Sequence, residues 1–158
     1  MRLNLNRKMG DLTMDIESFD RREWAFYWIT LVAAKYEQKL EVHLKKEGLD
    51  IPSWRVLMLM HPDKPRSVSF LANQSITKQS TMTRIVYRMR DRGLVTVKSS
   101  LKDGRVSVVS ATSEGLKLRK NAWDVVSKST NETFEGMSDN KLDGLNKTLS
   151  KIFDRLEG

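Results

Sequence analysis

The sequence predicts a mainly α-helical fold that carries one small β-hairpin, and two observations support this. Apolar residues recur at spacings of three and four over most of the chain, as they do on one face of a helix. Residues 94–109 instead place β-branched residues in two short runs around a Lys-Asp-Gly turn, which is typical of a hairpin. At 158 residues, the chain suits one domain, or one compact domain with an extra helical layer.

The first predicted helix covers residues 20–47. Its apolar stripe consists of Ala25, Ile29, Val32, Tyr36, Leu40 and Leu44. A second, adjacent stripe consists of Trp24, Trp28 and Leu31. Asp20 is the expected N-cap, with Glu23 three residues later, and Gly48 is the expected end. Such a wide apolar face needs more than one neighbour.

Three shorter helices are expected next. Pro52 suits the first turn of a helix that ends before Pro62. Ser67 opens a short helix that runs to residue 75, and Thr77 caps a longer helix that Gly93 ends. The buried side of the longer helix is predicted to hold Met82, Ile85, Val86 and Met89.

Two further helices follow the predicted hairpin. Thr112 or Ser113 caps the first of them, which Gly136 ends, and Ser138 starts the second. The last helix has a seven-residue apolar repeat formed by Leu142, Leu145, Leu149, Ile152 and Leu156. This repeat indicates either pairing with another helix or an ordinary core helix.

The positive charge of the chain is concentrated in one segment. The net charge is +8, and residues 64–105 hold ten Lys or Arg and only two Asp, so this segment alone accounts for the excess. Such segregation is typical of a surface that binds a polyanion, most simply nucleic acid. A solvated basic helix without a ligand is the alternative that charge alone leaves open.

The order of short helix, tight link, second helix and hairpin predicts a winged helix-turn-helix. In this motif the second helix enters the major groove of DNA. Because its apolar residues face the core, its opposite face presents polar and cationic groups suited to bases and phosphates. The candidate DNA-binding residues of this helix are Lys78, Gln79, Ser80, Thr81, Thr83, Arg84, Tyr87 and Arg88.

The predicted hairpin supplies the remaining DNA-binding candidates, which are Lys98, Lys102, Asp103 and Arg105. An arginine on a protruding loop suits a narrow minor groove, where negative potential is concentrated. Asp103 cannot contact DNA favourably. It either holds Arg105 extended through a paired hydrogen bond or caps the turn.

The stretch TKQSTMTRIVYRMRDRGLV and the segments after it resemble the multiple-antibiotic-resistance regulator (MarR) family. The family pattern continues with Asp-x-Arg in the wing and Leu-Thr-x-x-Gly at the next helix start. Four residues fall on that spacing, namely Asp103, Arg105, Thr112 and Gly115. Ala111 stands where leucine is usual, and Ser75 stands where the turn often has an apolar residue or glycine. The helix order outside these motifs also agrees.

The resemblance implies a homodimer in which the terminal helices of two chains interweave. Residues 19–50 and 113–158 would then form a helical dimerisation region, residues 51–112 the DNA-binding domain, and residues 1–18 a flexible arm. The apolar stripes of the terminal helices exceed what one small domain buries, which agrees with dimerisation. The resemblance further implies a repressor that binds double-stranded DNA sequence-specifically at a pseudo-palindromic operator. A small aromatic or phenolic ligand would release it from the operator.

The resemblance also places a ligand cavity between the dimerisation helices and the winged domain. Candidates by position are Trp24, Tyr27, Trp28, Trp54, Arg55 and His61. Arg55 lies on a largely apolar helix and would suit a carboxylate. The simpler interpretation is that the aromatic residues form the core and that Arg55 faces solvent.

No catalytic, metal or cofactor site is expected. The chain has no cysteine, which excludes disulfides, thiolate catalysis and cysteine-ligated zinc and fits a cytoplasmic protein. Its two histidines have no carboxylate cluster beside them. Paired carboxylates, a Ser-His-Asp set and a Gly-rich phosphate loop are absent from the sequence. No apolar run approaches the roughly 18 residues of a membrane span, and no signal peptide is evident.

Two functions other than a ligand-responsive regulator remain open at this point. A winged-helix protein can bind DNA without sequence preference, as an architectural protein without a ligand. A winged helix can also serve only to bind other proteins. The first alternative predicts salt-sensitive DNA binding with little sequence discrimination, and the second predicts no retention on DNA at low salt.

Overall fold

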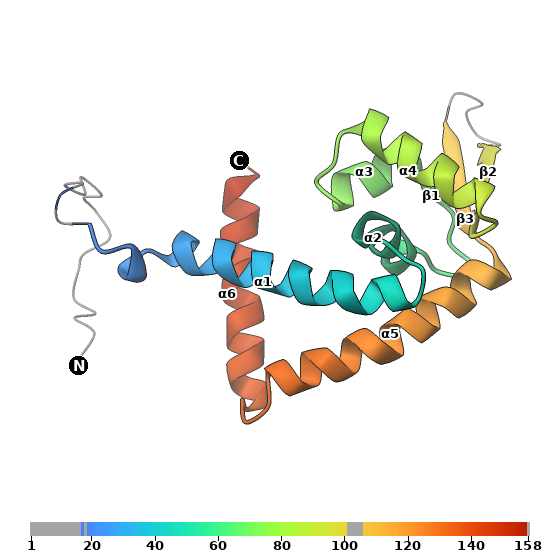
Figure 1. Ribbon diagram of the computed structural model, residues 1–158. Helices are drawn as coiled ribbons and strands as arrows, with labels where there is room; N and C mark the ends of the chain where they lie inside the picture. Colours follow the sequence, from blue (N-terminus) through green and yellow to red (C-terminus); the bar gives the residue numbers. More distant parts are fainter. Residues whose placement is uncertain (1–16, 18, 101–105, 158) are drawn as a thin grey trace. The chain divides into compact units, whose positions relative to one another are not determined.

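The computed structural model describes residues 17, 19–100 and 106–157, and the fold is mainly helical with a small antiparallel wing, as predicted (Figure 1). The helices of this part are the 3-10 helix η2 (Arg21–Glu23) and the α-helices α1 (Ala25–Lys46), α2 (Ile51–Leu59), α3 (Val68–Gln74), α4 (Gln79–Asp91), α5 (Ser113–Thr133) and α6 (Asp139–Leu156). The strands are β1 (Arg66–Ser67), β2 (Val95–Ser99) and β3 (Ser107–Ala111). None of these helices is both long enough and apolar enough to cross a bilayer.

The chain divides into two compact units, residues 1–39 and residues 40–158. The described part of the first unit contains η2 and most of α1, and none of its residues is buried. The prediction that Asp20 caps the long helix is wrong. Its carboxylate instead accepts a hydrogen bond from Arg22 N (2.9 Å) and caps η2, and extended backbone at Trp24 separates η2 from α1. The predicted arm, residues 1–18, lies outside the described residues apart from residue 17.

The core of the second unit is built from the end of α1, from α2 to α4, and from the wing. Leu40 and Leu44 are the buried residues of α1, whereas Val32 and Tyr36 of the same predicted stripe are exposed. Gly48 follows α1 with a φ of +70°, a left-handed conformation that ends the helix as predicted. The most deeply buried large side chains of the core are Leu44, Leu57, Met60, Leu71, Met82 and Met89.

Helices α3 and α4 form the predicted helix-turn-helix. Ser67 caps α3 by accepting a hydrogen bond from Phe70 N (3.1 Å), as predicted. The prediction for Thr77 is wrong, because its hydroxyl donates to the carbonyl of Ser75 (3.0 Å) and α4 begins only at Gln79. The predicted buried side of α4 is confirmed for Met82, Ile85, Val86 and Met89.

The wing is a three-stranded antiparallel sheet with the order β1-β3-β2. The predicted hairpin is confirmed as β2 and β3, with Val97 opposite Val109. The sequence did not indicate β1, whose two residues pair with Val108 and Val109. This short strand joins the start of α3 to the wing.

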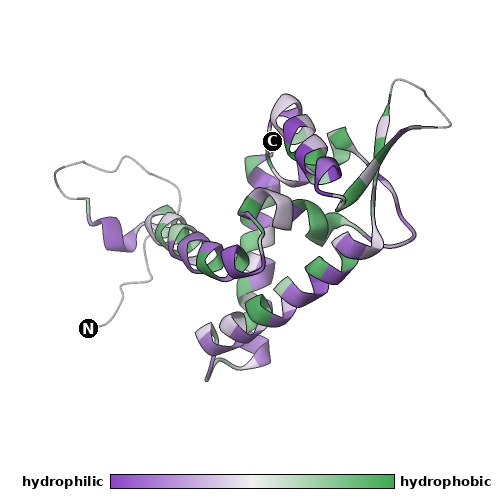
Figure 2. Cartoon of the chain, turned by 45° about the vertical axis from the view of Figure 1, so that its right-hand side comes forward, coloured by the Kyte–Doolittle hydropathy of each residue, from purple (hydrophilic) through white to green (hydrophobic). Residues whose placement is uncertain are grey.

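Helix α5 begins and ends where the sequence predicts, and α6 begins where it predicts. Thr112 caps α5 by accepting a hydrogen bond from Gly115 N (3.0 Å), and Gly136 follows α5 with a φ of +78°. Helix α6 starts after Ser138 and buries none of its residues. It is therefore not a core helix within this chain. Polar and apolar residues alternate along the described helices, α6 included (Figure 2).

Candidate nucleic-acid interface

The outward side of α4 collects the candidate residues of the predicted second helix. Since the opposite side of α4 lies in the core, these side chains share one surface. Most of them are exposed, namely Lys78, Gln79, Ser80, Arg84, Tyr87 and Arg88. Thr81 and Thr83 are half-buried, and the Thr83 hydroxyl donates to the carbonyl of Gln79 (2.9 Å). We call this exposed surface of α4 the recognition face.

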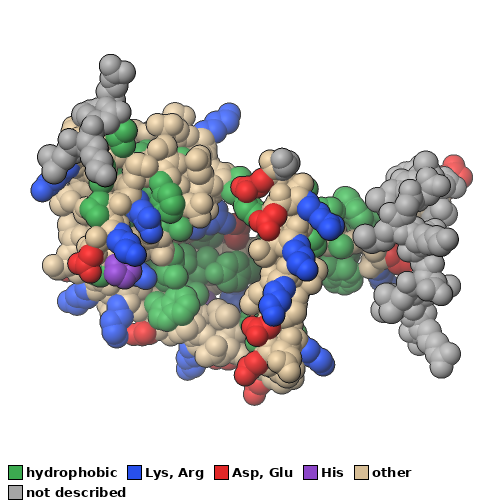
Figure 3. Space-filling model, turned by 180° about the vertical axis from the view of Figure 1, so that it is seen from behind, with side chains coloured by type: hydrophobic (Ala, Val, Ile, Leu, Met, Phe, Trp, Pro, Cys, Tyr) green, Lys and Arg blue, Asp and Glu red, His purple; other side chains and the backbone are tan. Residues whose placement is uncertain are grey.

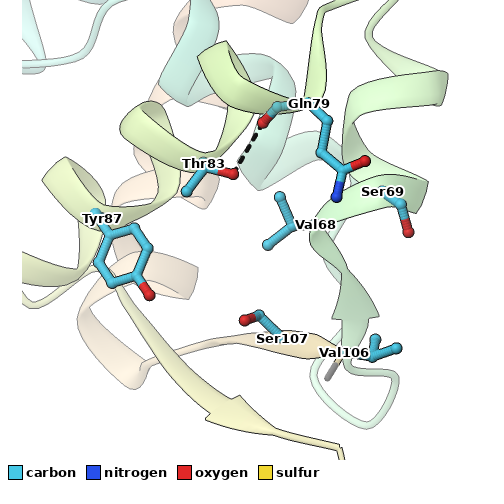
Figure 4. A pocket seen from close by; sticks show the side chains of 7 residues that line it. All are labelled: Val68, Ser69, Gln79, Thr83, Tyr87, Val106 and Ser107. Carbon is cyan, nitrogen blue, oxygen red and sulfur yellow. Dashed lines mark hydrogen bonds between the residues drawn. The ribbon is translucent and has the colours of Figure 1, made fainter. Parts of the chain in front are cut away.

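A shallow hollow lies between the recognition face and the wing (Figure 4). Its volume is about 160 Å³, and its lining residues are Val68, Ser69, Gln79, Thr83, Tyr87, Val106 and Ser107. In the close view, Tyr87 and Thr83 from α4 lie on one side and Ser107 of the wing on the other. Sequence reasoning missed the α3 and wing residues, because they reach this place only when β1 and β3 pair.

The arginines of α4 differ in the partners they have inside the protein. Arg88 forms an ion pair with Asp50 (2.5 Å), and Arg92, just after the helix, donates to the carbonyl of Gly48 (2.6 Å). Arg90 pairs with the neighbouring Asp91 (2.7 Å), and its guanidinium lies 4.5 Å from the Tyr87 ring centre. Among the described residues, Arg84 has no ion-pair partner, so of these arginines it has the charge most available to a ligand of this face.

Asp50 is the ion-pair partner of Arg88. Its carboxylate caps α2 by accepting a hydrogen bond from Ser53 N (2.8 Å). Partial burial alone would raise the pKa of Asp50, but the polar groups of Ser53 and the positive charges of Arg88 and Arg92 outweigh it and hold the pKa below its ordinary value. Asp50 therefore stays ionised at neutral pH.

The start of α4 also suits an anion. Lys78 occupies the N-cap position and its side chain makes no capping hydrogen bond. The N–H groups of the first turn thus lack the partner that a capping side chain would supply, and the positive end of the helix dipole lies beside them. Phosphate groups are commonly bound in such places.

The wing candidates are only partly described. Lys98 lies exposed on β2. Lys102, Asp103 and Arg105 lie outside the described residues, so their roles at the hairpin tip stay predictions. The described part of the candidate interface is therefore the recognition face with the base of the wing.

The six ligand candidates are divided between the two units. In the first unit, Trp24 and Trp28 are exposed and Tyr27 is half-buried, and Trp28 donates from Nε1 to the carbonyl of Arg22 (2.9 Å). In the second unit, Trp54 is buried in the core, whereas Arg55 and His61 are exposed. No group of three or more His, Asp or Glu side chains in the described part of the chain could hold a metal ion.

Comparison with known proteins gave a matching family profile and a similar relative. The profile of the MarR family matches residues 49–107. Over 141 residues the chain is 36% identical to the HTH-type transcriptional repressor IacR of Pseudomonas putida, a match that covers 89% of this chain and 84% of the relative.

Solved structures show the same fold. CouR from Rhodococcus jostii RHA1, bound to p-coumaroyl-CoA, is similar with a TM-score of 0.78 and 24% identity over 85% of this chain and 95% of that one. Bordetella bronchiseptica BpsR, whose DNA binding is regulated by 6-hydroxynicotinic acid, is similar with a TM-score of 0.76 and 18% identity over 86% and 97%.

Proposed function

The chain belongs to the MarR family of transcriptional regulators, and from that premise we propose that it is a repressor that binds a pseudo-palindromic operator as a homodimer. It is a regulator and not an enzyme. Family membership implies DNA and a second copy of the chain as partners. Residues 51–112 are the proposed DNA-binding domain, and the helices on either side of it are the proposed dimerisation region.

One observation carries the DNA-binding part of the proposal. All the excess charge of the chain falls within residues 64–105, and the exposed part of α4 within that segment is the recognition face. A helix of this kind offers hydrogen-bonding groups to base edges and cations to phosphates. Gln79, Ser80 and Arg84 are the proposed base or phosphate contacts at the start of the helix, and Lys98, Lys102 and Arg105 are the proposed contacts from the wing.

The exposed apolar side chains of the terminal helices support the homodimer. In the first unit these are Trp24, Phe26, Trp28, Leu31, Val32 and Tyr36. In the second unit they are Trp123 of α5 and Leu145, Leu149, Phe153 and Leu156 of α6. Apolar side chains lie open between charged ones on the surface (Figure 3). A monomer rarely leaves so much apolar surface in water, and a second copy would cover it.

We further propose that a small aromatic or phenolic ligand releases the protein from its operator. The aromatic residues near the start of α1 support this class, because the rings of Tyr27 and Trp28 lie 5.2 Å apart in an edge-to-face arrangement that an aromatic molecule can extend. In the second unit, and considered separately, Arg55 and His61 remain the predicted polar contacts. Trp54 is buried in the core, so it would support the ligand site without touching the ligand.

The test is a selection of bound fragments from the organism's own genomic DNA, followed by competition with an unrelated duplex of equal length. A sequence-specific regulator should prefer the selected site by about a thousandfold or more. Equal affinity for both duplexes would identify a non-specific, architectural DNA-binding protein instead. Absence of binding at low salt would contradict the proposal as a whole.

A further inference from the structure

Arg88 of α4 and Arg92, just after that helix, both contact the linker between α1 and α2. Arg88 Nη2 lies 2.5 Å from Asp50 Oδ2, and Arg92 Nη2 donates to the carbonyl of Gly48 at 2.6 Å. Residues four apart lie on the same side of a helix, so the two guanidinium groups contact the linker close together, at Asp50 and Gly48.

Asp50 is fixed by a second contact on its other oxygen. Oδ1 accepts the hydrogen bond from Ser53 N (2.8 Å) that caps α2, while Oδ2 accepts from Arg88. One carboxylate therefore joins the start of α2 to the recognition helix. The side chains of Asp50 and Arg88 remain 45% and 52% exposed, so the pair lies at the surface and not in the core.

We propose that Asp50 is a positioning residue for DNA binding, which holds Arg88 and the flank of α4 in the orientation that a duplex meets. This inference rests on the proposed function. A guanidinium has five N–H donors, and the contact with Asp50 uses only one Nη2 hydrogen, so donors remain for a phosphate. A side chain that is already held loses less conformational freedom on binding.

Positioning and simple electrostatics predict opposite signs for the loss of the Asp50 charge. Were Asp50 only a negative charge beside a basic surface, its neutralisation would strengthen binding to DNA. Were it a positioning residue, its neutralisation would weaken binding although the net charge rises. The sign of the change therefore distinguishes the two roles.

The experiment compares Asp50→Asn with Asp124→Asn in operator binding. Asparagine caps a helix as well as aspartate does, so α2 keeps its start while the ion pair is lost. Asp124 is a matched control, because it also forms an exposed ion pair, with Lys120 at 3.2 Å, and its change removes the same charge from α5. We expect operator affinity to fall about fivefold in Asp50→Asn, the upper range for a surface pair, and to stay unchanged in Asp124→Asn.

A double-mutant cycle locates the effect. Because Asp50 acts through Arg88, Asp50→Asn should add no loss in an Arg88→Gln background. Unchanged or tighter binding by Asp50→Asn overturns the inference, and so does an equal loss in both backgrounds. Thermal unfolding checks that the variants are folded. If Asp50→Asn is not, Arg88→Lys replaces it, since it keeps the charge without the planar fork, and wild-type affinity in that variant overturns the inference.

The proposed function is tested separately by the wild-type protein in the same assay. Failure of the wild type to bind any duplex at low salt contradicts the proposed function. Specific binding by the wild type together with undiminished binding by Asp50→Asn contradicts only the positioning role of Asp50.

Discussion

The carbonyl oxygen of Leu94 lies 2.1 Å from the position that a Cβ atom on Gly115 would occupy. The first turn of α5 is thus pressed against the backbone that leads into the wing. Thr112 holds the same junction, since its hydroxyl donates to the carbonyl of Gly93 (2.7 Å) and its N–H donates to the carbonyl of Leu94 (3.1 Å). The Thr-x-x-Gly motif therefore joins α5 to the winged domain.

Gly115→Ala should destabilise the protein by about 3 kcal/mol, because backbone cannot move aside as a flexible side chain can. The measurement is urea unfolding. Gly144→Ala is the control, since a Cβ at this position in α6 meets nothing within 4 Å. That variant should gain up to about 1 kcal/mol from improved helix propensity. Wild-type stability in Gly115→Ala would contradict the close approach of Gly115 to the Leu94 carbonyl.

Ile76→Asn should stabilise the protein. Ile76 has a φ of +49° in the turn between α3 and α4, a conformation that costs an L-residue about 1–2 kcal/mol, and its side chain is 78% exposed. Asparagine tolerates this conformation better, so we expect a gain of about 1 kcal/mol in the free energy of unfolding. Ile76→Val keeps the β-branched side chain and should show no gain. A loss of stability in Ile76→Asn would contradict this explanation.

The Asp50 carboxylate should make part of the free energy of unfolding depend on pH. Its pKa lies below the ordinary value of 3.8 in the folded protein, so its contribution is complete above that value and is lost as the pH falls through the lowered folded pKa. The wild type should thus exceed Asp50→Asn by about 0.5 kcal/mol at pH 7, as for an exposed ion pair. Unfolding measured between pH 7 and pH 2 should show this difference shrinking only below about pH 4. A difference independent of pH would exclude the ion pair as its cause.

Much of the fold follows from local sequence signals. Gly48, Gly93 and Gly136 end helices as predicted because each adopts a positive φ. Thr112 caps α5 as predicted, because its hydroxyl accepts a hydrogen bond from Gly115 N only three residues later. Asp20 and Thr77 do not cap the predicted helices. The Asp20 carboxylate accepts from Arg22 N and caps η2, and the Thr77 hydroxyl donates to the carbonyl of Ser75 in the turn before α4.

The contacts that organise the candidate interface were less predictable. Asp50 and Arg88 are 38 residues apart, and only the packing of α2 against α4 brings them together. The two residues of β1 are too few to show a strand pattern, although they connect α3 to the wing. The apolar stripes of α1 and α6 were visible in the sequence, but a single chain leaves them largely exposed.

Leu149→Glu should weaken the proposed homodimer. Leu149 is an exposed apolar residue of α6, and a charge there would be buried without a partner when a second copy covers this side. Sedimentation should show a shift toward monomer at micromolar concentration. Lys147→Glu lies two residues earlier, on the opposite side of the helix, and should leave the dimer intact despite the larger change in charge. Equal behaviour of the two variants would argue against this side of α6 as the interface.

The salt dependence of operator binding by the wild type and by Arg84→Ala tests the central claim most directly, because Arg84 is an exposed arginine of the recognition face with no ion-pair partner among the described residues. The slope of log affinity against log salt should be steep in the wild type, and in Arg84→Ala it should fall by about one while affinity drops about tenfold. Lys128→Ala, which removes an exposed charge from α5, should change neither quantity. Wild-type affinity and slope in Arg84→Ala would contradict the assignment of the recognition face to DNA.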